Sequence, residues 1–569
     1  MKISDTKKLA AITAAFFITV TAFSGCSESA NSSQTTSSVS QAAKSDIDAS
    51  IAAEDIDVGY DEESSIGITF ADGSAAIDGE GATSEGKTVT ISQAGTYILS
   101  GTATNGRIIV SANKTDEIKL IFNGVDITCA DNAPLLVSKA KKVYIVLEDG
   151  TENVLTDSAS YSLGEDDSNT DGAIFSKADL TINGSGTLTV NANYKHGIVS
   201  KDDLVITDGN INVTSASTAM EGKDSVKISG GKFDISAGTN GIKSTNTETS
   251  DKGFISVTGG SFTVVANNDA FEAETVLSIE GGSFDITTGG GSANASMKSD
   301  GTPNSDWQNN MGNGGGGPNG MGRPDDNGNG TGGEPPAMPT ADSTGLTIET
   351  AAANTTTDST DTTDNTSTSA KALKAGNEVN ISGGEFKIDS ADDSVHSNGN
   401  IVITGGNISV ASGDDGMHAN GNLTISDGTV DITKSYEGIE GSIVTIDGGT
   451  ISVVASDDGI NCAGGSDTGS TDRMGADQFS SQDGVELNIN GGTITIDAEG
   501  DGLDSNGNFT MAGGTVYVCG PTNGGNGALD YNGTATVTGG TLIACGAVGM
   551  EEGFGDNSTQ YSVLHDLGS

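Results

Sequence analysis

Several residue types are scarce in this sequence of 569 residues. It has eight prolines, five cysteines and one tryptophan, and aromatic residues make up 4% of the chain. Low proline without glycine at every third place excludes a collagen-like chain, and five cysteines are too few for a disulfide framework. Basic residues are also scarce, because 26 Lys and Arg stand against 78 Asp and Glu and give a net charge of −52. So acidic a surface repels nucleic acid, which we exclude as a partner.

Glycine, by contrast, is abundant, with 83 residues. Because glycine weakens helix interiors and aromatic residues are rare, the composition argues against a helical protein. Together with the acidic balance, it indicates a β-rich, repetitive and exported protein.

The N-terminus has the pattern of an export signal. Three lysines within the first eight residues precede an apolar run at 9–23, which is too short to span a membrane. The run ends in Phe-Ser-Gly-Cys26, which resembles the lipobox of bacterial lipoproteins and implies lipidation of Cys26. We therefore expect a lipoprotein signal peptide at 1–26, a polar tether and N-terminal extension at 27–84, and a place on the outer cell surface. An ordinary signal peptide with an incidental cysteine is the alternative.

A repeat of about 22 residues is the strongest pattern in the chain. A Gly-Gly pair followed by alternating apolar residues recurs, and 22 residues separate Gly384 from Gly406 and Gly406 from Gly428. Several short strands per unit predict an all-β fold, a single-stranded right-handed parallel β-helix of roughly 22-residue coils stacked about 4.8 Å apart. One inward column is expected to contain Phe386, Ile408, Val430, Ile451 and Ile494.

The β-helix is expected to extend over residues 85–569 with two extruded loops. A stretch at about 301–370, rich in Gly, Asn, Pro, Thr and Asp, predicts a disordered insertion, and 463–484 predicts a shorter one.

Acidic residues recur at one position of five successive units, just before a small residue and an inward aliphatic one. They are Asp393, Asp415, Glu437, Asp458 and Asp501. Stacked unit charges about 4.8 Å apart repel by about 3.5 kcal/mol at an effective dielectric constant near 20, so the column needs cations or protons. Calcium is favoured because it takes 6–8 oxygen ligands. Further ligands are expected from Asp392, Asp414, Glu440, Asp457, Asn461 and Asp504.

Each of these patterns has a simpler interpretation. The acidic column can be a solvated edge that discourages aggregation, and Asp beside Gly is a common turn residue. The stacked pair His396 and His418 can bind a transition metal or form a hydrogen-bonded ladder. Cys519 and Cys545 are also stacked neighbours, and a buried thiol pair is favoured over a disulfide.

Four runs in the C-terminal half resemble a family of bacterial cell-surface carbohydrate-binding β-helix proteins. The runs are Tyr436–Gly441, Asp457–Asn461, Gly500–Gly507 and Gly520–Tyr531. The resemblance covers roughly residues 85–565. It implies the fold of pectate lyases, calcium binding, and binding of acidic pectin chains and cellulose, with the Asp, Glu and Asn positions of these runs as calcium ligands.

These observations favour a surface-anchored binding protein that captures polygalacturonate-like polysaccharide, and in addition cellulose, through calcium ions in the carboxylate ladder. A cation between them explains how so acidic a protein can hold an acidic polymer. We expect a monomer attached to the membrane by its N-terminal lipid.

Two alternatives stay open. A calcium-dependent polysaccharide lyase needs an Arg or Lys base near the cation, and Lys243, Lys298 and Lys374 occupy suitable positions. The same lysines can instead alternate with Glu221 and Glu272 in a salt-bridged ladder, so we lean against an enzyme. The other alternative is a non-enzymatic adhesin or spacer, which predicts indifference to chelators.

Overall fold

The structure is a computed structural model that describes residues 43–164, 169–295, 369–463 and 481–566. The expected signal peptide, Cys26 and most of the two expected insertions lie outside these ranges. Residues 41–569 form one compact unit, and its described part contains 44 strands in one sheet. No described helix is long and apolar enough to cross a membrane.

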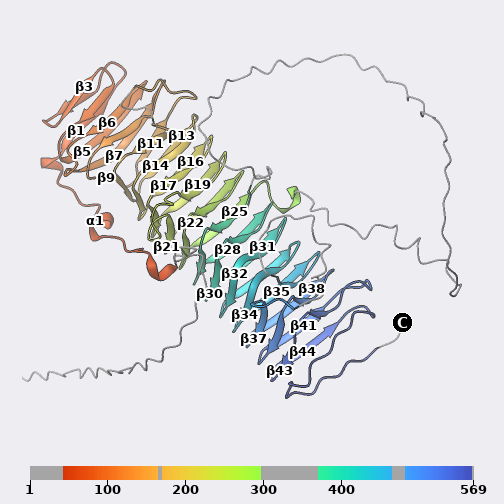
Figure 1. The fold of residues 1–569 in the computed structure, drawn as a ribbon. Coiled ribbons are helices and arrows are strands. Elements are labelled where there is room, and N and C mark those ends of the chain that lie inside the picture. Colours follow the sequence, from red (N-terminus) through yellow and green to blue (C-terminus); the bar gives the residue numbers. More distant parts are fainter. Residues whose placement is uncertain (1–42, 165–168, 296–368, 464–480, 567–569) are drawn as a thin grey trace, which may run out of the picture. The chain divides into compact units, whose positions relative to one another are not determined.

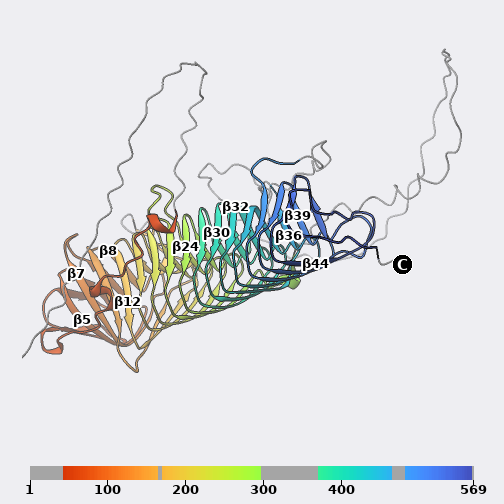
Figure 2. The same ribbon diagram turned by 90° about the horizontal axis from the view of Figure 1, so that it is seen from below.

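The strands stack in parallel along three faces, here called A, B and C, which the chain visits in turn (Figures 1 and 2). Over most of the stack, each strand pairs with the strand three further along. This arrangement confirms the predicted all-β fold with a mostly parallel sheet and is consistent with a β-helix. The antiparallel exceptions lie at the N-terminal end, in the pairs β1–β2 and β3–β4.

Face A has the most regular strands, in which buried and exposed residues alternate because successive side chains point to opposite sides. It consists of β10 (Glu152–Thr156), β13 (Thr187–Ala192), β16 (Asn210–Ser215), β19 (Lys232–Ala237), β22 (Ser261–Ala266), β25 (Ser283–Thr288), β28 (Glu385–Ser390), β31 (Asn407–Ser412), β33 (Thr429–Lys434), β35 (Thr450–Ala455), β38 (Thr493–Ala498), β41 (Thr515–Cys519) and β44 (Thr541–Cys545).

Face B has short strands, most of three residues, and in its C-terminal part five of them begin just after a residue of the acidic column. It consists of β4 (Thr88–Ile91), β6 (Arg107–Ser111), β8 (Leu135–Lys139), β11 (Gly172–Ser176), β14 (His196–Ser200), β17 (Met220–Gly222), β20 (Ile242–Ser244), β23 (Phe271–Ala273), β26 (Leu373–Ala375), β29 (Val395–Ser397), the first parts of β32 (Met417–Ile425) and β34 (Ile439–Ile446), β36 (Ile460–Cys462), β39 (Leu503–Ser505) and β42 (Leu529–Tyr531).

Face C completes each circuit. It consists of the first part of β7 (Glu117–Thr128), β9 (Lys142–Leu147), β12 (Asp179–Gly184), β15 (Asp203–Ile206), β18 (Ser225–Ile228), β21 (Phe254–Val257), β24 (Val276–Ile279), β27 (Glu378–Ile381), β30 (Asn400–Ile403), the last parts of β32 and β34, β37 (Glu486–Ile489), β40 (Asn508–Met511) and β43 (Ala535–Val537).

The N-terminal strands extend the sheet ahead of residue 85. They are β1 (Ile66–Phe70), β2 (Ala76–Asp78) and β3 (Ala82–Glu85), and β1 pairs in parallel with β5 (Gly95–Thr104). A segment at 43–65 precedes them and contains α1 (Ala53–Ile56) and the 3₁₀ turns Lys44–Asp46 and Glu62–Ser64. It lies against face C, where buried Asp55 pairs with Lys142 at 2.6 Å and Ile47 packs on Phe254.

The core contains columns of equivalent side chains. The predicted inward column is confirmed, since Phe386 pairs with Ile408, and Val430, Ile451 and Ile494 follow in register. On the N-terminal side the same column consists of Phe233, Phe262 and Phe284, which are stacked with centroids 4.6 and 4.8 Å apart. Phe284 also lies 4.6 Å from Phe386. Parallel stacking therefore brings identical rings into contact.

The two glycines of each Gly-Gly pair are required for different reasons. Gly384 has a φ of +106°, which residues with a side chain rarely adopt. A Cβ atom on Gly383 would lie 2.4 Å from the carbonyl oxygen of Glu280 in the preceding coil. The Gly-Gly pair is therefore required because one glycine forms a tight turn and the other lies close to the backbone of the neighbouring coil.

We expect Phe284→Ala to reduce the free energy of unfolding by about 3–5 kcal/mol, because it removes a buried ring packed between two others. Urea denaturation of the full chain measures the effect. The control is Ser283→Ala, since Ser283 is the exposed residue beside it and should change stability by less than about 0.5 kcal/mol. Equal effects of the two substitutions would contradict the packing argument.

Candidate functional site

The five acidic residues form a continuous column at the turn before face B. Backbone hydrogen bonds join successive turns, from Ser394 N–H to the Asp415 carbonyl at 3.1 Å, from Gly416 to Glu437 at 2.9 Å, from Gly438 to Asp458 at 2.9 Å and from Gly459 to Asp501 at 2.8 Å. The structure thus places the five side chains on adjacent turns. Asp393, Asp415 and Glu437 are buried, which argues against a fully solvated edge.

A second column runs beside the first, on the strands of face B. In register it contains Glu221, Lys243, Glu272, Lys374, His396, His418, Glu440, Asn461, Asp504 and Asp530. The five members from His396 to Asp504 each lie three residues after a member of the first column, so the charges of the two columns act on each other.

The carboxylates share a hydrogen-bonding pattern that the sequence did not reveal. In four of the five, one oxygen accepts the backbone N–H of the next turn: Oδ1 of Asp393 from Asp415 at 3.1 Å, Oδ1 of Asp415 from Glu437 at 3.2 Å and Oδ1 of Asp458 from Asp501 at 2.6 Å. Oδ1 of Asp501 accepts from Gly527 in the same way. The column therefore stabilises the turns, and the second oxygen of each of these carboxylates can contact a cation.

Protein cations occupy the N-terminal part of the two columns. Nζ of Lys371 lies 2.8 Å from Oδ1 of Asp392 and 2.7 Å from Oδ2 of Asp393. Burial opposes ionisation of Asp393, but Lys371 and His396 outweigh it and hold the pKa of Asp393 below its usual range. Lys371 was not among the expected site residues, because it follows the long interruption of the repeat.

The lysines of the second column are also paired. Lys243 lies 2.8 Å from Glu272, and Lys374 lies 3.1 Å from Asp269 and 3.5 Å from Glu272. The salt-bridged ladder is therefore confirmed at Glu272 for these two lysines, whereas Glu221 pairs with Lys201 at 3.1 Å. Lys298 lies outside the described residues. A lysine held between carboxylates is a poor base, so the arrangement does not favour the lyase.

Each of the two histidine rings makes contacts through both of its nitrogen atoms. Nδ1 of His396 lies 2.8 Å from Asp393, and Nδ1 of His418 lies 2.9 Å from Asp415 and 2.7 Å from Glu440. Their Nε2 atoms lie 3.0 Å from the amide oxygens of Asn398 and Asn420 respectively. The rings stack with centroids 5.1 Å apart. These contacts favour the hydrogen-bonded ladder over a transition-metal pair.

His418 acts as a cation within this ladder. Burial lowers its pKa, but hydrogen bonds to Asp415 and Glu440 outweigh the burial and raise the pKa to about 12. Glu440 is held below its usual pKa by the same contact, against the effect of burial. The charges of Asp393 and Glu440 are therefore compensated by Lys371 and His418. The pKa of Asp415 is nevertheless raised well above its usual value by burial and by Asp393, Asp414 and Glu440, although its hydrogen bond to His418 opposes the rise.

Further along the column the surroundings of the carboxylates change. Burial raises the pKa of Asp458 well above its usual value, and the charges of Asp457, Asp504 and Asp501 raise it further. Burial, Asp530 and Asp457 likewise raise the pKa of Asp501 to about 6. The charges that act on these two groups all come from carboxylates.

Glu437 and Asn461 connect the two regions. The pKa of Glu437 is raised by burial and then by Asp415, Glu440 and Asp458. Asn461 donates from Nδ2 to Oε2 of Glu437 at 2.9 Å, while its buried Oδ1 has no hydrogen-bond partner within the described ranges. An oxygen of this kind, next to Asp504 in the second column, is available to a cation.

In the described part of the chain, four groups of side chains could hold a metal ion, with ligand atoms within 4.8 Å of one another. They are Asp393, His396 and His418; Asp415, His418 and Glu440; Asp392, Asp393 and Asp414; and Asp458, Asp501 and Asp504. The first three include residues already bound to Lys371 or to a histidine. Of the other expected ligands, Glu437 bonds Asn461, and Asp457 accepts a hydrogen bond from Tyr436 at 2.6 Å.

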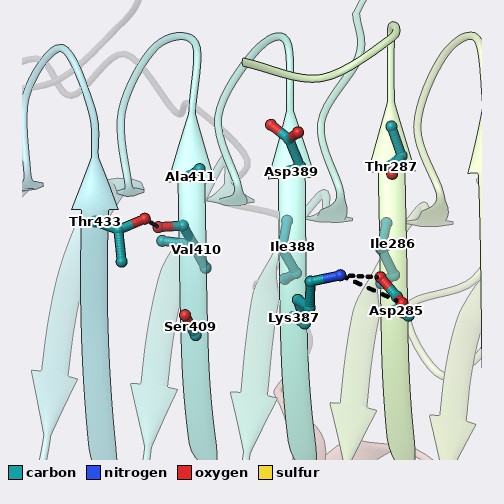
Figure 3. Close-up of a pocket in the computed structure, with 10 residues that line it drawn as sticks. All are labelled: Asp285, Ile286, Thr287, Lys387, Ile388, Asp389, Ser409, Val410, Ala411 and Thr433. Atoms are coloured by element: carbon teal, nitrogen blue, oxygen red, sulfur yellow. Dashed lines mark hydrogen bonds and ion pairs between the residues drawn. The ribbon is translucent and has the colours of Figure 1, made fainter. Parts of the chain in front are cut away.

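A shallow hollow of about 280 Å³ lies on the outer side of face A, across β25, β28, β31 and β33 (Figure 3). Lys387 crosses it to pair with Asp285 at 3.3 Å, and Thr433 donates to the Val410 carbonyl at 2.8 Å. Its other charged residue, Asp389, accepts a hydrogen bond from Ser292 N–H at 2.6 Å. Because these charged groups are exposed and already have partners, we place the candidate site at the acidic columns.

Replacing Lys371 by Met should lower the free energy of unfolding by about 3–5 kcal/mol, because it leaves Asp392 and Asp393 without their buried cation. Urea denaturation is again the measurement. Lys387→Met is the matched control: its pair with Asp285 is solvent-exposed, so the loss should stay below about 1 kcal/mol. A loss at Lys371 no larger than at Lys387 would show that charge compensation in the column is unimportant.

The chain was compared with known proteins. A carbohydrate-binding domain-containing protein of Acetivibrio thermocellus (strain ATCC 27405) is 45% identical over 126 residues, which cover 22% of this chain and 44% of that protein. The chain thus spans less than half of the length of this curated relative. The solved structure of the polysaccharide lyase-like protein from C. thermocellum, a gadolinium derivative, is 39% identical, covering 40% of this chain and 92% of that chain, with a TM-score of 0.39.

The model of one protein family matches most of the chain. Its description is carbohydrate-binding domain-containing protein, and the match covers residues 85–416 and 417–524. These ranges include all the expected metal ligands and every member of the two columns except Asp530. Since the match extends over well more than half of the sequence, the chain belongs to the family of carbohydrate-binding domain-containing proteins.

Proposed function

We propose that this protein captures acidic, polygalacturonate-like polysaccharide through calcium ions held by the C-terminal part of the carboxylate columns. Membership of a carbohydrate-binding family supports a polysaccharide partner. The proposed ligands are Asp458, Asp501 and Asp504, with the unpartnered amide oxygen of Asn461 beside them.

The observation that carries this proposal is the equivalence of positions along the first column. Oδ1 of Asp393 accepts the backbone N–H of the next turn, and its Oδ2 contacts Nζ of Lys371 and Nδ1 of His396. Asp458 and Asp501 also give Oδ1 to the next turn, but the charges acting on them are carboxylates. A cation bound at the second oxygens of Asp458 and Asp501 would neutralise their charges, as Lys371 neutralises the charge of Asp393.

The chemistry of the ligands favours calcium. All the proposed donors are oxygens of carboxylate or amide groups, which suit hard cations with flexible coordination. Asp458, Asp501 and Asp504 are partly exposed, whereas Asp393 and Asp415 are buried. Partial exposure leaves room for a uronate carboxylate to share the ion, and the shared cation would overcome the repulsion between a protein of net charge −52 and an acidic polymer.

The remaining expectations belong to the same proposal. We infer a right-handed β-helix with coils of about 22 residues, a monomer, calcium as cofactor, and a place on the outer cell surface through lipidated Cys26, with cellulose as a further ligand. The lyase alternative is disfavoured because Lys243 and Lys374 are paired with carboxylates. The binding experiment below also tests lyase and adhesin functions.

The first test measures retention of the protein on polygalacturonate with calcium or with EDTA. Retention should require calcium and should weaken at least about tenfold in Asp458→Asn, since one charged ligand is lost. Asp234→Asn on face A is the control, because Asp234 is exposed and distant in register from the columns. If neither EDTA nor Asp458→Asn reduces retention, the proposal is overturned. A rise in ultraviolet absorbance from unsaturated product would identify a lyase, and no retention at all an adhesin or spacer.

The second test uses the pH dependence of stability. In the folded protein the pKa of Asp501 is about 6 rather than 3.8, so the folded state binds more protons than the unfolded state between these values. Stability of the chelated protein should therefore fall from about pH 4 to about pH 7, and the fall should be smaller in Asp501→Asn. Melting temperatures at each pH measure this, with Asp234→Asn as control. Calcium should reduce the fall in the wild type, and identical slopes in wild type and Asp501→Asn would contradict the assignment.

A further inference from the structure

Two cysteines lie side by side on the outer surface of face A. Cys519 ends β41 and Cys545 ends β44, and the two residues are paired in register on neighbouring parallel strands. Both are exposed, which corrects the expectation of a buried thiol pair. In β41 the reason is the alternation along the strand, because Val518 before Cys519 is buried in the core, whereas β44 is exposed over most of its length.

The side chains of the two cysteines are in contact. The thiol of Cys545 donates to the carbonyl oxygen of Val518, the residue before Cys519, at 3.5 Å. The charge of Cys545, then that of Asp497, raises the pKa of Cys519, and the two thiols also share a hydrogen bond. The thiol of Cys545 is therefore turned toward the strand that carries Cys519.

The backbone spacing suits a disulfide. Paired residues of neighbouring strands lie about 4.8 Å apart, within the range of about 4.4–6.8 Å between the Cα atoms of disulfide-bonded cysteines. In the described residues β44 pairs with β41 on one side and with no strand on the other. A strand held on one side can shift to let the two Cβ atoms approach.

We propose that Cys519 and Cys545 are a reversible cross-linking site, which a small disulfide oxidant such as oxidised glutathione converts into an intramolecular disulfide. One protein thiolate attacks the oxidant, forms a mixed disulfide and releases one glutathione thiol. The other protein thiol then attacks the protein sulfur of that mixed disulfide and releases the second glutathione. The two cysteines lose two hydrogens in total, and the oxidant gains them as two thiols.

The other described cysteines differ in burial. Cys129 and Cys462 are buried, so an oxidant in solution does not reach their thiols, whereas Cys519 and Cys545 are exposed. The proposed bond would fasten β44 to β41 and close the loop at 520–544, so it would restrain opening of the strand at this end of face A. An exposed bond of this kind is expected to be easily reduced.

The test treats the full-length protein with oxidised glutathione and compares it with Cys519→Ser, Cys545→Ser and the double variant. Peptide mass spectrometry should find 519 and 545 linked in the wild type, with two hydrogens lost and no glutathione retained. Each single variant should keep one glutathione at its remaining cysteine, because the partner thiol that would displace it is absent. The double variant accounts for any thiol at Cys26, and dithiothreitol should restore the reduced wild type.

Amide hydrogen exchange gives a readout that a mere surface reaction would not change. Oxidation should slow exchange in β44 of the wild type by several-fold and leave exchange in the two single variants unchanged, since cross-linking restrains local opening. Two glutathione adducts on the wild type, or two unreacted thiols, would overturn the proposal. A linked pair with unchanged exchange in β44 would overturn the part concerning restraint of the strand.

Discussion

In-register stacking of parallel strands is the constraint on which the rest of this structure depends. Each strand lies one hydrogen-bond spacing from its neighbour, so equivalent positions of successive repeats are forced into contact. For apolar residues this contact is favourable, as in the column of Phe233, Phe262, Phe284 and Phe386, where each ring adds area and stacking. For ionised residues the same contact is costly unless the charges alternate or a cation lies between them.

The two acidic columns meet that cost differently along their length. In the second column Glu221, Lys243, Glu272 and Lys374 alternate in sign, so neighbours attract each other. Around Asp393 and Asp415, Lys371 and the histidines held by Asn398 and Asn420 contact the carboxylates, although burial and neighbouring carboxylates still raise the pKa of Asp415. The pKa values of Glu437, Asp458 and Asp501 are also raised, but in the described residues none of these three carboxylates contacts a lysine or a histidine. The change in compensation, rather than acidity alone, distinguishes the C-terminal part as the cation site we propose.

The periodic features of the fold could be predicted from the sequence, because a 22-residue repeat with period-two alternation fixes which residues share a column. The inward column from Phe386 to Ile494 and the stacking of His396 on His418 follow from that spacing. Lys371 could not be found, since it lies just after an interruption that hides its equivalence to Asp393. The hydrogen bonds from each turn to the preceding carboxylate were also hidden, because they involve backbone amides. Exposure of Cys519 could have been found, because it lies at an odd position after Gly-Gly, where face A side chains point outwards.

A cation that binds only the stacked form would stabilise that form by mass action, so binding and folding of the C-terminal coils are coupled in the proposed mechanism. This coupling makes loss of glycan retention alone ambiguous, because a missing ligand can act by loosening the coils. The exposure of the groups separates the two effects. A cation bound by buried groups such as Asp415 could only be structural, since no ligand from solution reaches it. Asp458, Asp501 and Asp504 are partly exposed, so an ion there can keep coordination positions open to a polymer while it offsets the repulsion among the three carboxylates. The same ion can therefore be structural and bridging. The two roles differ only in whether water or a carboxylate of the polymer occupies the coordination positions that the protein leaves open.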